Sequence, residues 1–208
     1  MKIKISGITR MREIEFLSEL KPDFVGFVFD KNAVNYITPQ LAALLAAKLH
    51  PVIRKVGVFA NSTIEEINET VRITGIDLVQ LNGDETPYFI SQLEFEVWKN
   101  ISVSDNIDRK SLKAYGVPLA VHIDALGLQT DVGLIQTAAA LGPIIFSGGV
   151  NIENITELAA IIPPYAVDVS GSVSSPNGFK DYLRCKEFIA AVRGLEEKEN
   201  AELQDAEG

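Results

Sequence analysis

The 208-residue chain has a single cysteine, Cys185, and no apolar run long enough to span a membrane. One cysteine cannot form an intrachain disulfide, so we expect a reducing compartment, the cytoplasm. The alternating strand pattern that opens the chain leaves no apolar core for a signal peptide, which supports the same expectation. Cys185 lies in a helical segment, where we expect it to be a packed residue rather than a nucleophile.

Positive charge is also scarce: the chain has 19 Lys and Arg residues and 28 Asp and Glu residues, which gives a formal net charge of −9. A nucleic-acid partner would require a basic face, so we expect no nucleic-acid partner, and the missing apolar run excludes a membrane partner. Part of the acidity lies near the end of the chain. We predict a folded unit over residues 1–194 and an acidic tail over 195–208 that is a frayed helix or disordered.

Apolar segments of strand length alternate with amphipathic helical segments along the chain. The predicted strands are Ile3–Ser6, Phe24–Phe29, Lys55–Ala60, Leu78–Asn82, Val97–Ile101, Leu119–Asp124, Ile144–Gly148 and Val167–Ser170. The predicted helices are Arg10–Leu20, Pro39–Leu49, Thr63–Thr74, Pro87–Leu93, Ile107–Tyr115, Asp131–Leu141, Ile152–Ile161 and Asp181–Arg193. Two helices carry start signals: Thr38 stands before a proline, and Ser62 with Glu65 forms a capping-box pattern.

Strands separated by helices pair in parallel through right-handed crossovers, so the pattern predicts the α/β class. Eight such units without a shift in composition indicate a single (β/α)8 TIM barrel. The alternative is an open, doubly wound sheet. A dinucleotide-binding sheet would carry G-x-G-x-x-G after its first strand, whereas this chain reads Ser6-Gly7-Ile8-Thr9-Arg10, and we therefore favour the barrel.

Small residues follow the last two predicted strands, where barrels commonly bind phosphate. Gly148 and Gly149 end the seventh strand, and Ser170-Gly171-Ser172 end the eighth. Glycine lets backbone N–H groups approach an anion, and a helix predicted to begin near Asn151 would add a favourable dipole. We therefore predict phosphate binding at these five residues. The alternative is that the glycine pair forms only a tight turn.

The strand positions that face the barrel interior are unusually polar near the carboxyl ends. They are Lys4, Ser6, Gln80, Asn82, His122, Asp124, Asp168 and Ser170. A purely structural barrel would hold Val, Ile and Leu there, so these residues predict a pocket for a small molecule. The alternative is that the polar side chains only satisfy one another.

Several segments resemble the phosphoribosylanthranilate isomerase family of tryptophan biosynthesis, over about residues 1 to 193. The matching segments are Lys2–Arg10, Gly26–Phe29, Val56–Phe59, Asp77–Thr86 and Phe146–Asn154. The resemblance implies a barrel that binds a phosphorylated sugar and performs an Amadori-type aldose–ketose isomerisation without metal or organic cofactor. It also implies that Asp124 is the acid that protonates the ring oxygen, and that Ser6 stands where the family has its cysteine base.

Three further departures from the family pattern occur: the two substitutions described next, and Gly127-Leu128-Gln129-Thr130-Asp131 in place of the family's Gly-Gly-Thr-Gly segment after the sixth strand. Asn35 replaces an arginine that contacts the substrate, and Asn82 replaces a histidine. The resemblance places substrate binding at Asn35, Gln80, Asn82 and Asp168, but an asparagine gives an anionic carboxylate no charge-assisted contact. The substitutions at the base and at these two sites predict weak or lost activity.

A cysteine thiol has a pKa near ~8.5, so thiolate is available near neutral pH. A serine hydroxyl ionises at far higher pH, so Ser6 can act as a base only if another group takes its proton. His122 is the candidate helper in the barrel interior, although a core histidine with satisfied partners is the commoner case. Two alternatives remain open: a non-catalytic protein that binds a phosphorylated ligand, and an enzyme for another phosphosugar. We expect a monomer or a homodimer.

Overall fold

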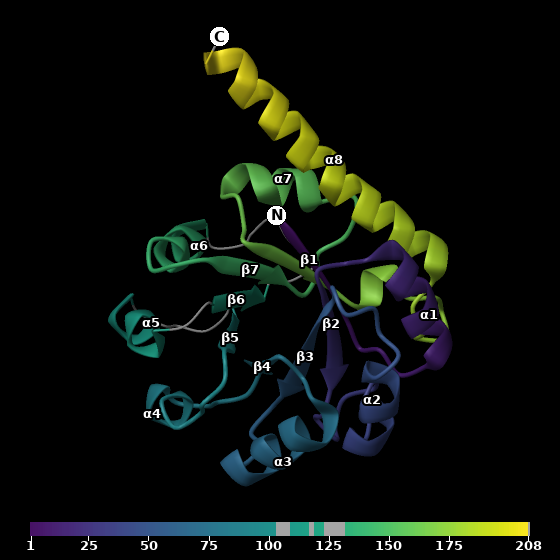
Figure 1. Cartoon of the computed structure of the whole chain (residues 1–208). Coiled ribbons are helices and arrows are strands. Elements are labelled where there is room, and N and C mark those ends of the chain that lie inside the picture. Colours follow the sequence, from purple (N-terminus) through teal and green to yellow (C-terminus); the bar gives the residue numbers. More distant parts are fainter. Residues whose placement is uncertain (103–108, 117–118, 123–131, 208) are drawn as a thin grey trace.

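The computed structural model describes all residues except 103–108, 117–118, 123–131 and 208. Eight parallel strands form a closed barrel in chain order (Figure 1). They are β1 (Lys2–Ser6), β2 (Phe24–Val28), β3 (Arg54–Phe59), β4 (Leu78–Leu81), β5 (Val97–Ser102), β6 (Leu119–His122), β7 (Ile144–Ser147) and β8 (Ala166–Val169). Because β1 pairs with both β2 and β8, the barrel prediction is confirmed and the open sheet is excluded.

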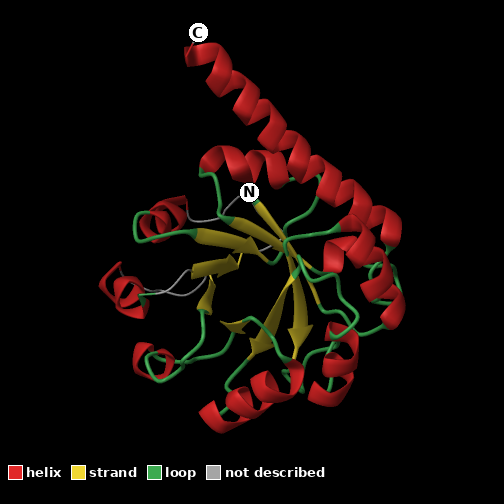
Figure 2. Ribbon diagram, in the orientation of Figure 1, coloured by secondary structure: helices red, strands yellow, loops and turns green. Residues whose placement is uncertain are grey.

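Helices surround the strands, as Figure 2 shows in red around yellow. They are α1 (Met11–Leu20), α2 (Pro39–Ala46), α3 (Ile64–Thr74), α4 (Pro87–Ile90), α5 (Arg109–Tyr115), α6 (Val132–Ala139), α7 (Ile155–Ile161) and α8 (Tyr182–Glu207), with the short 3-10 helix η1 (Gly171–Val173) after β8. No helix among the described residues is long and apolar enough to cross a membrane.

The apolar core has two parts, because alternate residues of a strand point to opposite faces. In β2, Val25 and Phe27 belong to the larger cluster between strands and helices, whereas Phe24 and Val28 belong to a smaller cluster. That smaller cluster lies inside the barrel and includes Trp98, which is fully buried. The polar interior residues lie nearer the carboxyl ends of the strands than this cluster does. Apolar side chains therefore form the bottom of the pocket.

Helix starts agree with the sequence in one case and differ in another. Thr38 caps α2, which begins with a proline, as predicted. The capping box of α3 is formed by Thr63 and Glu66, so the prediction of Ser62 and Glu65 was one residue too early. Thr63 Oγ1 accepts from the Glu66 N–H at 3.2 Å, and the Glu66 carboxylate accepts from the Thr63 N–H at 2.9 Å. The sequence allows either pair to form the capping box, and the backbone conformation places Thr63 and Glu66 in it.

The final helix is much longer than the predicted Asp181–Arg193. Helix α8 continues to Glu207 and extends beyond the barrel in Figure 1. The boundary between residues 1–194 and 195–208 therefore falls within a continuous helix. A separate acidic tail stays a prediction.

Candidate active site

A cavity of about 260 Å³, here called the mouth cavity, opens at the carboxyl ends of the strands. The structure brings together seven of the predicted site residues in its lining: Ser6, Asn35, Gln80, Asn82, Gly148, Asp168 and Ser170. The predicted acid, Asp124, lies outside the described residues. Gly149, Gly171 and Ser172 follow the lining residues in the chain.

Ser6 and Asp168, which line the mouth cavity, form a compact hydrogen-bonded group with the buried Lys4. The Ser6 hydroxyl donates to Asp168 Oδ1 at 2.6 Å. Lys4 Nζ donates to Asp168 Oδ2 at 2.6 Å and to Ser6 Oγ at 2.5 Å. Strands β1 and β8 hold the three in place, because Lys4 stands opposite Asp168 in their register and Ser6 lies two residues further along the same face.

Lys4 is fully buried, and Asp168 is 9 % exposed. Burial lowers the pKa of Lys4, while the Asp168 carboxylate acts in the opposite direction. The Ser6 hydroxyl therefore has a carboxylate as proton acceptor and an ammonium as donor. The sequence suggested His122 as helper; His122 lies in β6, and its side chain falls outside the described part of the structure. Among the described side chains, Asp168 accepts the hydrogen bond from the Ser6 hydroxyl.

Gln80 and Asn82 lie side by side on the opposite wall. Gln80 Nε2 donates to Asn82 Oδ1 at 3.0 Å. Gln80 Oε1 is buried and finds no hydrogen-bond partner within the described part of the chain. Because buried polar atoms are nearly always paired, this oxygen is suited to accept a hydrogen bond from a ligand hydroxyl or amine.

The Asn35 side chain, from the loop after β2, packs against Gly7 in the loop after β1. Gly7 adopts φ 81°, and a Cβ there would approach Asn35 Nδ2 to 1.9 Å and Ser170 Oγ to 3.1 Å. Glycine is thus required at this point by both conformation and space. The contact places the Asn35 amide near Ser170.

The glycine pair after β7 adopts the left-handed conformation, with φ 63° at Gly148 and 48° at Gly149. The predicted helix Ile152–Ile161 is present as α7, but it begins at Ile155 and not near Asn151. Asn154 instead closes a turn: its Oδ1 accepts from the Asn151 N–H at 2.9 Å, and its Nδ2 donates to the Gly149 carbonyl at 2.8 Å. The helix whose dipole was expected to favour an anion at the glycine pair therefore begins further from that pair than predicted.

Gly171 and Ser172 begin η1, so their N–H groups precede its first hydrogen bond. Both residues are exposed. The neighbouring Ser170 hydroxyl donates to the Ser6 carbonyl at 3.0 Å. The loop thus presents backbone N–H groups, while the Ser170 side chain joins β8 to β1.

Three polar residues of the lining were absent from the predicted site: Asp30, Asn100 and Ser147. Ser147 Oγ lies 3.4 Å from Asn100 Oδ1. Both stand at inward strand positions, so the strand alternation was a signal that could have identified them.

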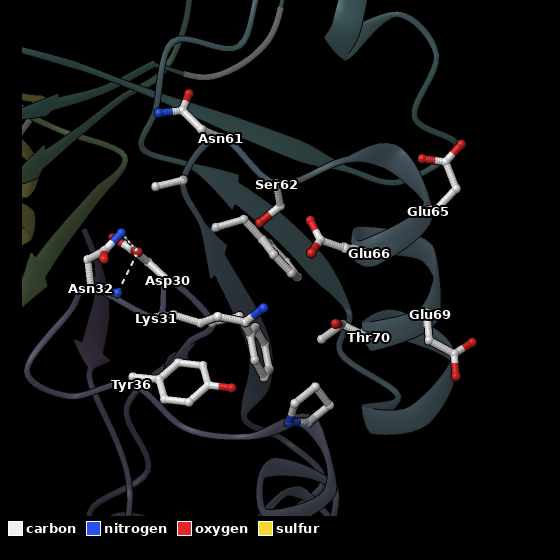
Figure 3. Close-up of a pocket in the computed structure, with 14 residues that line it drawn as sticks. Asp30, Lys31, Asn32, Tyr36, Asn61, Ser62, Glu65, Glu66, Glu69 and Thr70 are labelled. Atoms are coloured by element: carbon white, nitrogen blue, oxygen red, sulfur yellow. Dashed lines mark hydrogen bonds between the residues drawn. The ribbon is translucent and has the colours of Figure 1, made fainter.

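A second cavity of about 580 Å³ lies between the β2–α2 loop and α3 (Figure 3). It shares Asp30, Phe59 and Ala60 with the mouth cavity. Lys31 points across it toward α3 in Figure 3, and forms no ion pair with another residue of the described part. An aromatic pair, Phe29 and Phe59, stacks at 5.1 Å between ring centroids and supplies apolar lining.

The sequence profile of the N-(5'phosphoribosyl)anthranilate (PRA) isomerase family matches residues 3–191. N-(5'-phosphoribosyl)anthranilate isomerase of Geobacter sulfurreducens is 37% identical over 203 residues, covering 93% of this chain and 99% of that protein. The protein of the same name from Clostridium acetobutylicum is 38% identical over 204 residues, covering 93% and 98%.

A solved structure of phosphoribosyl anthranilate isomerase agrees with a TM-score of 0.84 at 31% identity, covering 93% of this chain and 99% of that chain. That protein is in complex with reduced 1-(o-carboxyphenylamino)-1-deoxyribulose 5-phosphate. The match extends from β1 into α8. The chain belongs to the N-(5'-phosphoribosyl)anthranilate isomerase family.

Proposed function

We propose that this protein isomerises N-(5'-phosphoribosyl)anthranilate, a step of tryptophan biosynthesis, with Ser6 and Asp168 together acting as the base. The observation that carries the proposal is the 2.6 Å hydrogen bond from the Ser6 hydroxyl to Asp168. An adjacent general base is what a weakly acidic hydroxyl needs to act in proton transfer.

In the proposed step, Ser6 Oγ takes the proton from C2 of the ring-opened substrate while its own proton passes to Asp168 Oδ1. The electron pair of the C2–H bond forms a C1–C2 double bond and neutralises the iminium nitrogen at C1. Return of that proton to C1 and loss of the C2 hydroxyl proton, which restores the acid used for ring opening, form the C2 carbonyl of the ketose. Lys4 donates to both partners and keeps their geometry fixed. Asp124 remains the proposed acid for ring opening.

We expect turnover below that of an enzyme with a thiolate base. A serine hydroxyl ionises far above neutral pH, so each turnover requires Asp168 to accept its proton, whereas a thiolate base needs no such helper. General acid–base catalysis typically contributes about 10²–10⁴-fold, so a poorly matched base loses part of that factor. This loss of rate is the physical reason for the weak activity that the sequence predicts.

We place the substrate phosphate at Gly148, Gly149, Gly171 and Ser172, with Ser170 joining this loop to β1. The support is that left-handed glycines and the first N–H groups of η1 present donors to an anion. The ribose then reaches Ser6 and the buried oxygen of Gln80. The aromatic half extends toward the second cavity, where the Lys31 ammonium supplies a positive charge that Asn35 lacks.

Turnover of N-(5'-phosphoribosyl)anthranilate by the purified protein tests the proposal. Ser6→Ala and Asp168→Asn should each lower kcat by about 10²-fold or more, since each breaks the proton transfer. Asp84→Asn is the matched control, because it removes the same charge from an exposed residue near the same end of the barrel. Unchanged kcat in Asp168→Asn would exclude the carboxylate from the step.

The alternatives give distinct results. Binding of ribose 5-phosphate without turnover would indicate the non-catalytic binding protein, and turnover of a different phosphosugar alone would indicate another substrate. Growth of a strain that lacks the isomerase, when supplied with this chain, would support the proposal in the cell. We place the protein in the cytoplasm, as a monomer or homodimer, consistent with its buried free thiol.

A further inference from the structure

Lys180 is a buried lysine near the end of the segment that joins β8 to α8, and only 6 % of it is exposed. Its Nζ donates to the Ser170 carbonyl and to Ser170 Oγ, both at 3.2 Å, and to Ser174 Oγ at 2.8 Å. These residues flank η1. One ammonium therefore holds both ends of the loop that carries Gly171 and Ser172.

Glu13 of α1 connects the same lysine to the loop after β1. It is 2 % exposed, and its Oε1 accepts from the Lys180 N–H at 2.7 Å. Its Oε2 accepts from the N–H groups of Thr9 at 2.8 Å and Arg10 at 2.9 Å. The carboxylate thus faces backbone donors and fixes the position of the Lys180 main chain.

The Lys180 ammonium makes no direct ion pair with any residue in the described part of the chain. Its three donors go to neutral oxygens of the loop. Burial lowers the pKa of Lys180, and the charges of Glu13, Cys185 and Asp168 oppose that shift from a distance. A buried cation without a direct counterion is costly, so an anion on the other face of the loop would stabilise it.

We propose that Lys180 is a positioning residue for the phosphate group: it fixes the Ser170–Ser174 loop and adds positive potential beneath it. The inference rests on the phosphate site of the proposed function. Lys180 acts through Ser170 and the loop backbone, because its donors are already engaged. It is thus separate from Ser6 and Asp168, which act on the carbon skeleton.

Binding of ribose 5-phosphate and of ribose, measured by calorimetry or amide chemical shifts, tests the inference. Lys180→Met keeps a long apolar side chain and removes the ammonium. We expect the affinity for ribose 5-phosphate to fall about tenfold or more, the size of one lost hydrogen bond to a charged group, with ribose unaffected. In turnover, KM should rise while kcat changes little.

Lys186→Met is the matched control, because it removes the same charge from an exposed position of α8. It should leave the affinity unchanged within twofold. Lys180→Arg keeps the charge and should retain more phosphate affinity than Lys180→Met. Should Lys180→Met fail to fold, Ser174→Ala removes one of the three acceptors and should weaken ribose 5-phosphate about threefold.

The outcomes separate the two proposals. Wild-type protein that does not bind ribose 5-phosphate would overturn the phosphate site itself. Wild-type binding together with unchanged affinity in folded Lys180→Met, or in Ser174→Ala where the first variant does not fold, would overturn the role of Lys180 alone. Equal loss of ribose and ribose 5-phosphate affinity would also overturn it, because it would indicate a general structural effect.

Discussion

Ser6 is the proposed base: the sequence resemblance puts it at the position of the family's cysteine, and its hydroxyl contacts both Lys4 and Asp168. We expect Ser6→Cys to raise kcat by about 10²-fold, since an ammonium lowers the pKa of a neighbouring thiol and makes thiolate available near neutral pH. The measurement is the pH dependence of kcat. Lys4→Met in the Ser6→Cys background should move the apparent pKa upward, and a lower kcat in Ser6→Cys would contradict this role.

Gly7 and Gly75 separate two reasons for a glycine. Both have positive φ, 81° and 61°, but only at Gly7 would a Cβ meet other atoms. Gly75→Ala should cost about 1–2 kcal/mol in the free energy of unfolding, from the left-handed backbone alone. Gly7→Ala should cost more because of Asn35. Urea unfolding measures both, and removal of the amide in Gly7→Ala/Asn35→Ala should recover part of the loss. Equal costs at the two sites would rule out the Asn35 contact.

At the residue scale, the sequence predicted which side chains face the mouth and missed how they pair. Lys4, Ser6 and Asp168 were all expected to point inward from strand alternation. Their mutual hydrogen bonds depend on the β1–β8 register, which joins positions 164 residues apart in the chain. No local pattern encodes that register. The same holds for Lys180 and Glu13, which meet only when α1 packs near the start of α8.

Among the elements, a second buried ion pair joins β5 to the loop after β4, and its carboxylate also contacts the loop after β3. Lys99 of β5 donates to Glu85 Oε2 at 3.0 Å, and Glu85 Oε1 accepts from the Asn61 N–H at 2.7 Å. The Lys99 and Glu85 side chains are 3 % and 2 % exposed. The pair holds the loop beside Asn82 in place.

We expect Lys99→Met to lower the free energy of unfolding by about 3–5 kcal/mol, because it leaves the Glu85 carboxylate buried and unpaired. Arg54→Met breaks the ion pair with Glu96, whose side chains are 41 % and 44 % exposed, and should cost less than about 1 kcal/mol. Urea unfolding of the two variants gives the comparison. Similar small losses in both would show that the buried pair adds nothing to stability.

Element ends were the least predictable part of the fold, for a physical reason. Strands and helices follow from alternation and amphipathic spacing, but their ends depend on single hydrogen bonds. Asn154 closes a turn ahead of α7, and Thr63 rather than Ser62 caps α3. Each alternative cap has a suitable side chain in the sequence, so only the backbone conformation decides between them.

At the scale of the whole molecule, eight repeated units predicted barrel closure, and closure creates the site by bringing β8 against β1. The reactivity of the single cysteine measures whether α8 stays packed against η1. Cys185 is fully buried on α8, and its Sγ lies 3.9 Å from the Val173 carbonyl of η1. Burial raises the pKa of the Cys185 thiol from 9.0 to about 12.

Native protein should therefore react with a thiol reagent at pH 8 only through opening of the structure, whereas the chain in denaturant reacts at once. Between pH 9 and 12 the unfolded chain loses its thiol proton and the folded chain keeps it, so the free energy of unfolding should fall as pH rises through this window. Ribose 5-phosphate should slow the labelling, because it stabilises the native state and its loop lies against Cys185. Labelling rates with and without the ligand give the measurement, with ribose as the control. Fast labelling of native protein would mean that α8 separates easily from η1.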